Sequence, residues 1–201
     1  MIASIVLISA YLVGAIPFGW LLVKWKTGRD VRSAGSGNIG ATNVLRTTGR
    51  ALGVLTLALD IAKGYFAVWL AGRLTGGSAA WMSVAALAVM AGHAYPVFLK
   101  FRGGKAVASF VGAFLCLAPL PLLVVLALFV LVVAKTRYIS LGSIIAAVAL
   151  PFAVWFVAHA ALPAIAASAV GGAFIIWRHK DNIGRLRAGT EHALSLGGTQ
   201  S

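Results

Sequence analysis

Most of the side chains that could do chemistry lie in three polar segments, each placed between long apolar stretches. The first segment runs from Ser33 to Arg46 (SAGSGNIGATNVLR) and combines glycines, asparagines and hydroxyls with one arginine. Glycine lets a backbone approach a ligand closely, and successive amide N–H groups can form an anion-binding nest. Arg46 adds a planar fork suited to phosphate oxygens. The segment therefore suits a phosphate group, although a flexible Gly/Ser-rich loop beside a membrane span would look the same.

The second polar segment covers residues 92–105 (GHAYPVFLKFRGGK) and ends in Gly103-Gly104-Lys105, where the next apolar stretch begins. Bare amides and an ammonium group would then stand near a helix N-terminus, the end of a helix that favours anions. An ordinary helix-connecting turn with snorkelling cations would have a similar sequence. Because two phosphate-compatible loops are expected on one membrane face, we favour phosphate binding for both.

The third polar segment covers residues 177–191 (WRHKDNIGRLRAGTE). His179 is one of four histidines in the chain and the one flanked by charged and amide side chains. It could bind an anion or donate a proton, or it could be a surface residue. For Glu191 we expect structural pairing with an arginine and no part in proton transfer.

Asp60 and Lys63 lie inside an apolar stretch, three residues apart and therefore on one face of a helix. Charged groups within a membrane span are costly and are usually paired or functional. We expect a mutual ion pair that braces the helix bundle beneath the site, in preference to a transport relay. His93, beside Gly92 near the end of its apolar stretch, could be a hydrogen-bonded structural histidine or a catalytic one.

The elements that carry these segments must lie in a membrane. Of the 201 residues, 61% are hydrophobic and only 10% are charged, whereas about a quarter of a soluble domain is charged. The net charge of +13 could suggest a nucleic-acid partner, but the cations form short runs between apolar stretches and no continuous polar face. That pattern follows the positive-inside rule. We therefore expect an all-α, polytopic membrane helix bundle, one domain over residues 1–201, and no nucleic-acid partner.

A helical crossing of a hydrocarbon core about 30 Å thick needs about 20 apolar residues. Stretches of suitable composition cover residues 1–25, 51–72, 79–99, 141–161 and 162–177. A further stretch, residues 106–134, is interrupted by Pro119 and Pro121 and could form one long helix or two short ones. With two helices, four basic clusters that hold every Lys and Arg except Lys63 and Arg73 share one side. Because proline disfavours helix at the preceding residue, we predict a reversal there and seven transmembrane spans, with the N-terminus outside and the C-terminus cytoplasmic.

The segments SAGSGNIGATNVLR, GHAYPVFLKFRGGKAVA and RHKDNIGRLRAGTE, in this order between apolar spans, resemble the bacterial acyl-phosphate:glycerol-3-phosphate acyltransferase family (PlsY). The LDIAKG stretch around Asp60 and Lys63 also fits the pattern of that family. The resemblance covers almost the whole chain. One departure is Ala106, since the family usually continues GGKG at this point. A methyl group there could restrict close backbone approach, and we expect activity to be retained.

The resemblance implies an enzyme that moves an acyl group from acyl phosphate to the 1-hydroxyl of glycerol 3-phosphate, giving lysophosphatidic acid and phosphate. It implies a site on the cytoplasmic face of the bacterial inner membrane, in contact with membrane lipid and with neither cofactor nor metal. The residues carried over as catalytic are Ser36, Arg46, Lys105, His179 and Asn182. Those expected to bind substrate are Gly37, Asn38, Gly40, Thr42, Asn43, Gly103, Gly104 and Ser143. Those expected to be structural are Asp60, Lys63, His93 and Glu191.

The acceptor hydroxyl normally needs a base, and the sequence offers no obvious one. No histidine is followed five residues later by aspartate, the signature of another acyltransferase family, and no Ser-His-Asp set is evident. A phosphate monoester has a second pKa near 6, so the phosphate of the substrate can take the proton itself. The main rival is a transporter for an anionic phosphorylated solute, which would need polar groups across the whole membrane. A non-catalytic membrane scaffold would leave the three polar segments without a purpose.

Overall fold

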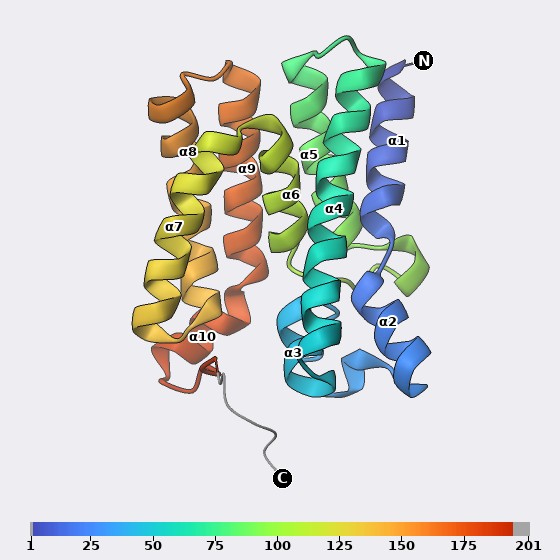
Figure 1. The fold of residues 1–201 in the computed structure, drawn as a ribbon, viewed down its shortest axis with the longest axis vertical. Coiled ribbons are helices and arrows are strands. Elements are labelled where there is room, and N and C mark those ends of the chain that lie inside the picture. Colours follow the sequence, from blue (N-terminus) through green and yellow to red (C-terminus); the bar gives the residue numbers. More distant parts are fainter. Residues whose placement is uncertain (1, 195–201) are drawn as a thin grey trace. The chain divides into compact units, whose positions relative to one another are not determined.

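The computed structural model describes residues 2–194, and the regular secondary structure in that range is helical (Figure 1). The α-helices are α1 (Ile2–Ala15), α2 (Phe18–Thr27), α3 (Ala41–Thr48), α4 (Arg50–Leu74), α5 (Ala79–Ala94), α6 (Val107–Leu117), α7 (Pro119–Thr136), α8 (Ile139–Ala158), α9 (Leu162–Arg178) and α10 (Lys180–Arg187). Two short 3₁₀-helices lie in the connections, η1 (Val31–Ser33) and η2 (Val97–Leu99). The expected all-α class is therefore confirmed.

Five helical stretches are long and apolar enough to cross a membrane. They are Ile2–Thr27, Arg50–Leu74, Ala79–Leu99, Pro119–Thr136 and Ile139–Ala158. Two further apolar helices, α6 and α9, are shorter, with 11 and 17 residues. At 1.5 Å per residue α6 is only about 16 Å long.

The break predicted at the two prolines is confirmed as a helix boundary. α6 ends at Leu117, and α7 begins at Pro119. Ala118 between them has an extended φ of −152°, as expected for a residue that precedes proline. Pro119 and Pro121 both lie in the first turn of α7, where the missing N–H groups have no helical acceptor to lose. The reversal of the chain at this point remains a prediction.

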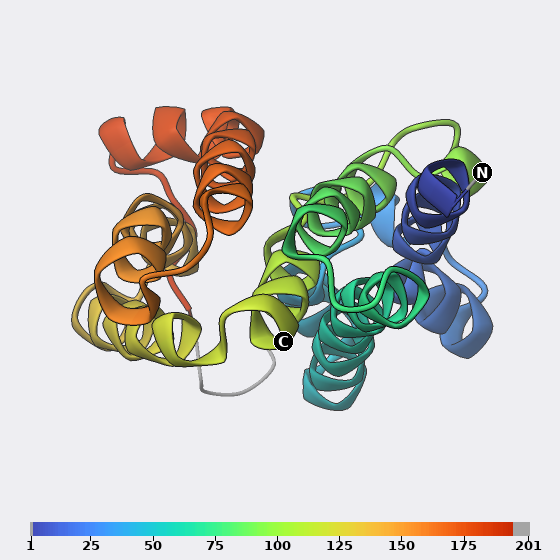
Figure 2. The same ribbon diagram turned by 90° about the horizontal axis from the view of Figure 1, so that it is seen from above.

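The chain divides after Leu117 into two compact units, which we call unit 1 (α1 to α6) and unit 2 (α7 to α10). In unit 1, α1 packs against α5 and α4 against α6, and α5 contacts both α4 and α6 (Figure 2). In unit 2, α8 packs against α7 and α9, and α10 follows directly on α9. The expectation of one domain over the whole chain remains a prediction.

Glycines hold the two tightest helix pairs of unit 1 together. A Cβ atom added to any of them would overlap a backbone carbonyl of the partner helix. They are Gly14 and Gly92 between α1 and α5, and Gly64 and Gly112 between α4 and α6. Helix pairs in a membrane gain stability from close backbone approach, which small residues permit. The high glycine content of the sequence therefore has a packing cause in this unit.

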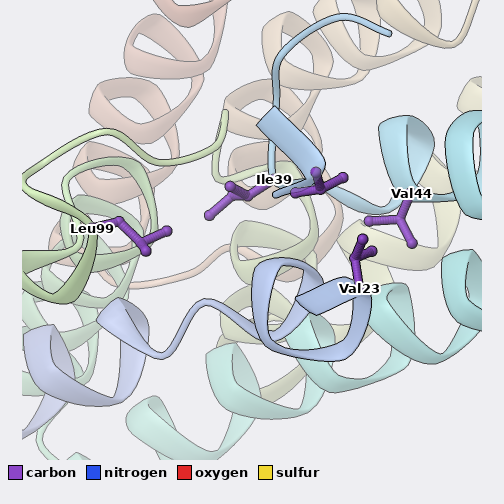
Figure 3. Packing of buried hydrophobic residues seen from close by; sticks show 5 residues of the cluster. Val23, Ile39, Val44 and Leu99 are labelled. Atoms are coloured by element: carbon purple, nitrogen blue, oxygen red, sulfur yellow. The ribbon is translucent and has the colours of Figure 1, made fainter. Parts of the chain in front are cut away.

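At one end of unit 1, an apolar cluster joins α2, α3 and the two loops between the long helices. Its buried side chains are Val23 of α2, Val31 of η1, Ile39 of the following loop, Val44 of α3 and Leu99 of η2 (Figure 3). Trp20 and Leu52 pack against it from the side. The cluster therefore fixes the first and second polar segments beside each other.

Candidate active site

Asn43, in the first turn of α3, organises the first polar segment from within. The side chain is only 2% exposed. Its Nδ2 donates to three carbonyl groups of the preceding loop, those of Val31, Ala34 and Asn38, at 3.2, 3.2 and 2.8 Å. Its Oδ1 accepts the N–H of Ser36 at 2.9 Å. These bonds give Asn43 a buried positioning role, and the substrate-binding role expected for it remains a prediction.

The glycines and amides of this loop are used mainly within the protein. Gly37 has a left-handed φ of 68°, and its N–H donates to the carbonyl of Ala34 at 3.1 Å. The N–H of Gly40 donates to Oδ1 of Asn38 at 2.8 Å, which closes a turn in front of α3. The amides of Ser36, Gly37 and Gly40 therefore have acceptors within the protein, and anion binding by this segment remains a prediction. The described chain holds no acceptor for the N–H groups that open α3, those of residues 41 and 42.

Two of the expected catalytic side chains project from this loop and helix into solvent. Ser36 lies exposed on the loop, and Arg46 lies exposed on the last turn of α3. Thr42 and Arg46 are four residues apart and share one face of α3. Gly49, with a φ of 108°, separates α3 from α4. The loop thus presents a hydroxyl and a guanidinium on a frame that Asn43 holds.

The second polar segment folds back on the end of α5. The N–H groups of Gly103 and Gly104 donate to the carbonyls of Ala94 and His93, both at 3.1 Å. A Cβ atom at Gly104 would overlap the imidazole of His93. We expected these two amides to be available for phosphate, but the structure uses them in this packing. Lys105 is half-buried, two residues before α6, and it is one of three cations of the loop, with Lys100 and Arg102.

The ion pair expected between Asp60 and Lys63 is confirmed. Both side chains are buried in α4, and Nζ of Lys63 lies 2.8 Å from Oδ1 of Asp60. His93 of α5 is also buried, with Nδ1 at 3.6 Å from the same oxygen. Of the two roles left open for His93, the structure therefore supports the structural one.

In unit 2, Glu191 is the acceptor at the centre of a hydrogen-bond cluster. Its Oε1 accepts from Ser140 Oγ at 2.9 Å and from Asn182 Nδ2 at 2.7 Å, and its Oε2 accepts from Arg185 Nε at 2.8 Å. The carboxylate is only 6% exposed. Burial by itself would raise the pKa of Glu191, but the hydrogen bonds from Asn182, Ser140 and Arg185 outweigh it and lower that pKa. The expected structural pairing of Glu191 with an arginine is confirmed.

His179 and Ser143 are buried in unit 2, and each bonds to its own helix. Nδ1 of His179 lies 2.8 Å from the carbonyl oxygen of Ile175. Because a carbonyl can only accept, Nδ1 carries a proton in this contact. The hydroxyl of Ser143 donates to the carbonyl of Ile139 at 2.9 Å. Across residues 2–194, no group of three or more His, Cys, Asp or Glu side chains is arranged to hold a metal ion.

Comparison with known proteins fits this combination of apolar helices and polar loops. The family model described as glycerol-3-phosphate acyltransferase matches residues 4–189. The chain belongs to this family. The resemblance identified from the three polar segments is thereby confirmed.

Relatives named glycerol-3-phosphate acyltransferase are similar over nearly their whole length. The one from Desulforamulus reducens is 47% identical over 92% of each chain, and the one from Geobacter sulfurreducens is 49% identical over 91% of this chain and 93% of its own. Two crystal structures of PlsY, described as an integral membrane glycerol 3-phosphate acyltransferase, have the same fold. The glycerol 3-phosphate form gives a TM-score of 0.90 at 39% identity over 96% of both chains, and the lysophosphatidic acid form 0.87 at 37%. Together with the apolar helices, these matches make the chain an integral membrane protein.

The structure explains the departure at Ala106 from the glycine usual in the glycerol-3-phosphate acyltransferase family. Ala106 is fully buried and has a left-handed φ of 63°. Such a conformation costs an L-residue about 1–2 kcal/mol and costs glycine nothing. Lys100 and Phe101, in the same loop, also have positive φ, 52° and 60°. The loop around Lys105 therefore holds three residues with positive φ, Lys100, Phe101 and Ala106, and such strain is typical of functional loops.

Some residues that shape the acyltransferase loops were not foreseen from the sequence. Ser140 and Arg185 hold Glu191, and Asp30 holds Arg32 in front of the first loop. The hydrogen bonds from Arg32, one at 2.6 Å, lower the pKa of Asp30 well below its usual range and raise that of Arg32. Asp30 and Arg32 are two residues apart, and this spacing of opposite charges in a loop was the available signal. For Ser140 no signal in the sequence stands out from its neighbours.

Proposed function

We propose that the chain is a glycerol-3-phosphate acyltransferase that uses acyl phosphate as donor and makes lysophosphatidic acid and phosphate. Family membership supports the acyltransferase reaction. Support for the acceptor and product comes from two PlsY structures of the same fold, one in a glycerol 3-phosphate form and one in a lysophosphatidic acid form. The choice of acyl phosphate rests on the resemblance of the three polar segments.

The observation that carries the proposal is the apolar cluster at one end of unit 1. By packing Ile39 and Val44 against Leu99, it joins the loop that bears Ser36 and Arg46 to the segment that leads to Lys105. Both substrates carry a phosphate group, and a guanidinium and an ammonium are the side chains best suited to hold two of them. We assign phosphate binding to Arg46, Lys105 and the N–H groups that open α3. For Gly103 and Gly104 we now propose a packing role.

The reaction needs little more than positioning and charge stabilisation. The 1-hydroxyl of glycerol 3-phosphate attacks the carbonyl carbon of acyl phosphate, and the bond from that carbon to the phosphate oxygen breaks. Inorganic phosphate leaves, and a phosphate dianion takes the hydroxyl proton. Lys105 and Arg46 hold the two substrates in contact and stabilise the negative charge that develops on the carbonyl oxygen. Because acyl phosphate is already activated, no covalent enzyme intermediate is required.

The roles proposed for the polar residues of unit 2 are supported by the family motifs and not by geometry at the phosphate-binding loops. His179, Asn182 and Ser143 are carried over from the family motifs, so their catalytic and substrate-binding roles remain predictions. Their side chains are buried, and Asn182 donates to Glu191. We propose that Glu191 acts by fixing Asn182.

We also propose seven spans in the bacterial inner membrane, with the N-terminus outside and the active site facing the cytoplasm. Five long helices and the shorter α6 and α9 supply that number of crossings. The positive-inside rule then assigns the basic loops to the cytoplasm. In a Cys116→Ala background, thiols introduced at Lys26 and Arg137 should react with a reagent on the cytoplasmic side, and one at Gly76 with a reagent outside. Reaction at Arg137 and Gly76 from the same side would contradict seven spans.

The interior of unit 1 favours an enzyme over a transporter. On the side of Lys63 that leads toward the end of α4 at Leu74, the described buried positions of α1, α4, α5 and α6 are apolar or glycine. The exceptions are Ser83 and Ser109. A path for an anionic solute would need polar groups along its whole length. The buried ionisable groups of this unit, Asp60, Lys63 and His93, therefore do not continue along the helices to its other end.

Phosphate release by the purified protein tests the proposal. With acyl phosphate and glycerol 3-phosphate we expect release of phosphate. With acyl-CoA in place of acyl phosphate the leaving group would be CoA, so lysophosphatidic acid is measured instead, and we expect none. Lys105→Ala and Arg46→Ala should each lower kcat/KM by at least about 100-fold, the effect typical of a lost charge-stabilising group. Lys26→Ala, which removes an exposed cation from α2, is the matched control and should leave the rate unchanged. Absence of release by the unmodified protein, or full activity of Lys105→Ala, would disprove the proposal.

A further inference from the structure

Three ionisable side chains from two helices meet inside unit 1. Asp60, Lys63 and His93 are 1%, 5% and 3% exposed. Oδ1 of Asp60 lies 2.8 Å from Nζ of Lys63 and 3.6 Å from Nδ1 of His93. Charged side chains are costly to bury in a membrane bundle, so they are usually paired with one another and have a function. The Asp60–Lys63 pair lies within α4, and His93 is the member that connects it to α5.

Lys63 connects this group to the break between α1 and α2. Its Nζ donates to the carbonyl of Ile16 at 2.8 Å and lies 5.7 Å from the centre of the Phe18 ring. Pro17, between these two residues, has no N–H group and interrupts the helix. The ammonium is a second donor to the Ile16 carbonyl, which also accepts the N–H of Phe18 at 3.2 Å, and it ties the start of α2 to α4.

His93 connects the same group to the loop of Lys105. The backbone carbonyl of His93 accepts the N–H of Gly104 at 3.1 Å. The nearest atoms to a Cβ placed on Gly104 are three atoms of the His93 ring, which the added atom would overlap. The imidazole thus lies against the backbone directly before Lys105, and its other edge faces Asp60.

We propose that Asp60, Lys63 and His93 form a positioning triad that sets the place of Lys105. The triad is buried in the helix bundle, and it supports both the Lys105 loop and the start of α2. Val23 of α2 belongs in turn to the apolar cluster that holds the first loop. The inference rests on the proposed function for its effect on catalysis. It makes the three residues positioning residues, since none of them needs to touch a substrate.

The contact between His93 and Gly104 offers a test by paired substitutions. Gly104→Ala forces a methyl group into the ring and should displace Lys105, and a misplacement of about 1 Å costs roughly 100-fold in rate. His93→Ala removes the support and should also reduce kcat/KM and raise KM for one of the phosphate substrates. The double variant should be no worse than His93→Ala, because the methyl group then has space. Additive losses would mean that the two residues act independently, and would overturn the proposal.

A readout that does not depend on catalysis keeps the two proposals separate. In a Cys116→Ala background, Lys105→Cys supplies a thiol whose rate of reaction with a soluble thiol reagent reports its surroundings. Adding His93→Ala or Gly104→Ala should change that rate several-fold, and adding His159→Ala, a substitution outside this unit, should not. An unchanged thiol rate in both His93→Ala and Gly104→Ala would overturn the positioning triad, whatever the activity. A changed thiol rate, together with no phosphate release by the unmodified protein, would support the triad and reject the proposed function.

A loss of folding must be distinguished from a loss of position. Circular dichroism and elution as a single species check that each variant is folded. A variant that is merely less well folded has fewer active molecules, which lowers the apparent kcat and leaves KM unchanged. If His93→Ala does not fold, Gly104→Ala tests the same contact with the triad intact, and its thiol rate must then change for the proposal to stand.

Discussion

Glu191 allows a calculation of what one side chain contributes, because all its carboxylate contacts lie within unit 2. Three donors surround it: Ser140 and Asn182 on one oxygen and Arg185 on the other. In Glu191→Gln the side chain keeps its size and one oxygen, but it loses its charge and turns an NH₂ group toward Arg185. In Glu191→Ala both acceptors disappear, and the buried Ser140 and Asn182 lose the oxygen to which they donate.

The expected losses of stability follow from these contacts. A hydrogen bond to a charged group contributes about 1.5–3 kcal/mol, but Arg185 is 31% exposed, so screening by solvent reduces its share to about 1 kcal/mol. We therefore expect Glu191→Gln to cost about 1–2 kcal/mol. Glu191→Ala adds about 1–3 kcal/mol for each of the two buried donors that loses its acceptor, or about 3–8 kcal/mol in all. At roughly 2–4 °C per kcal/mol for a chain of this size, Tm should fall by about 2–8 °C in Glu191→Gln and by about 6–32 °C in Glu191→Ala.

Thermal unfolding of the purified protein in detergent, followed by circular dichroism, measures both variants. The matched control is Asp181→Asn, which removes an exposed carboxylate from the first turn of α10. It should cost no more than the roughly 0.3–1 kcal/mol of a charge at a helix N-terminus. The reasoning fails if Glu191→Gln unfolds at the temperature of the unmodified protein, or if Glu191→Ala is no worse than the Asp181 control.

Glu191→Gln should also change how the stability of the folded protein depends on pH. The pKa of Glu191 in the folded chain lies below the ordinary value, near 4.3 for an unfolded glutamate. The stabilisation is therefore complete above about pH 4.3 and is lost as the pH falls through the folded pKa. Glu191→Gln should lose less stability on acidification than the unmodified protein does. Parallel losses in the two proteins would mean that Glu191 carries no depressed pKa.

Three further substitutions probe other features of the structure. Gly64→Ala places a methyl group against the carbonyl of Ser109 and should cost about 2–3 kcal/mol in thermal unfolding, whereas Gly184→Ala, which has open space, should be neutral or stabilising by up to about 1 kcal/mol. Ala106→Gly relieves about 1–2 kcal/mol of backbone strain, but it loses about 0.8 kcal/mol of methyl burial and about 0.5–1 kcal/mol through backbone entropy. Its free energy of unfolding should therefore stay within about 1 kcal/mol of that of the unmodified protein. A larger loss would contradict the strain at this residue. Asn43→Ala removes the hydrogen bonds that shape the first loop and should slow phosphate release by at least about tenfold, and full activity would exclude its positioning role.

The features that could be predicted from the sequence depend on short spacings. Asp60 and Lys63 are three residues apart on one helix, so their ion pair follows from helical geometry. The break before Pro119 follows from the chemistry of proline in the same way. The pairing of Glu191 with an arginine was expected because the surrounding segment is rich in arginine. Each of these needs only neighbours along the chain.

The features that could not be predicted depend on contacts between distant segments. The N–H groups of the glycines before Lys105 were expected to donate hydrogen bonds to a phosphate group, but they bond to carbonyls at the end of α5. Composition does not show in which direction an amide points. Asn43 looked like a ligand for substrate, but it turns inward to three carbonyls of its own loop. Ser140 resembles every other serine in an apolar helix until Glu191 is brought beside it. The hydrogen-bond partners of these groups became visible only in the fold, and the substrate-binding roles expected for Asn43 and the glycines remain predictions.

The close packing of α4 on α6 also fixes how deep the Lys105 loop can lie. Through His93, this loop stands level with Asp60, ten residues or about 15 Å along α4 from its start. From Asp60 to Leu74 only about 21 Å of helix remains, about 9 Å less than a hydrocarbon core of about 30 Å. Either the bilayer thins around unit 1 or the loop lies below the lipid headgroups. With acyl phosphate as the proposed donor, the acyl chain can stay in the leaflet while its phosphate reaches Lys105, and the water-soluble acceptor then has to approach below the level of the surrounding headgroups.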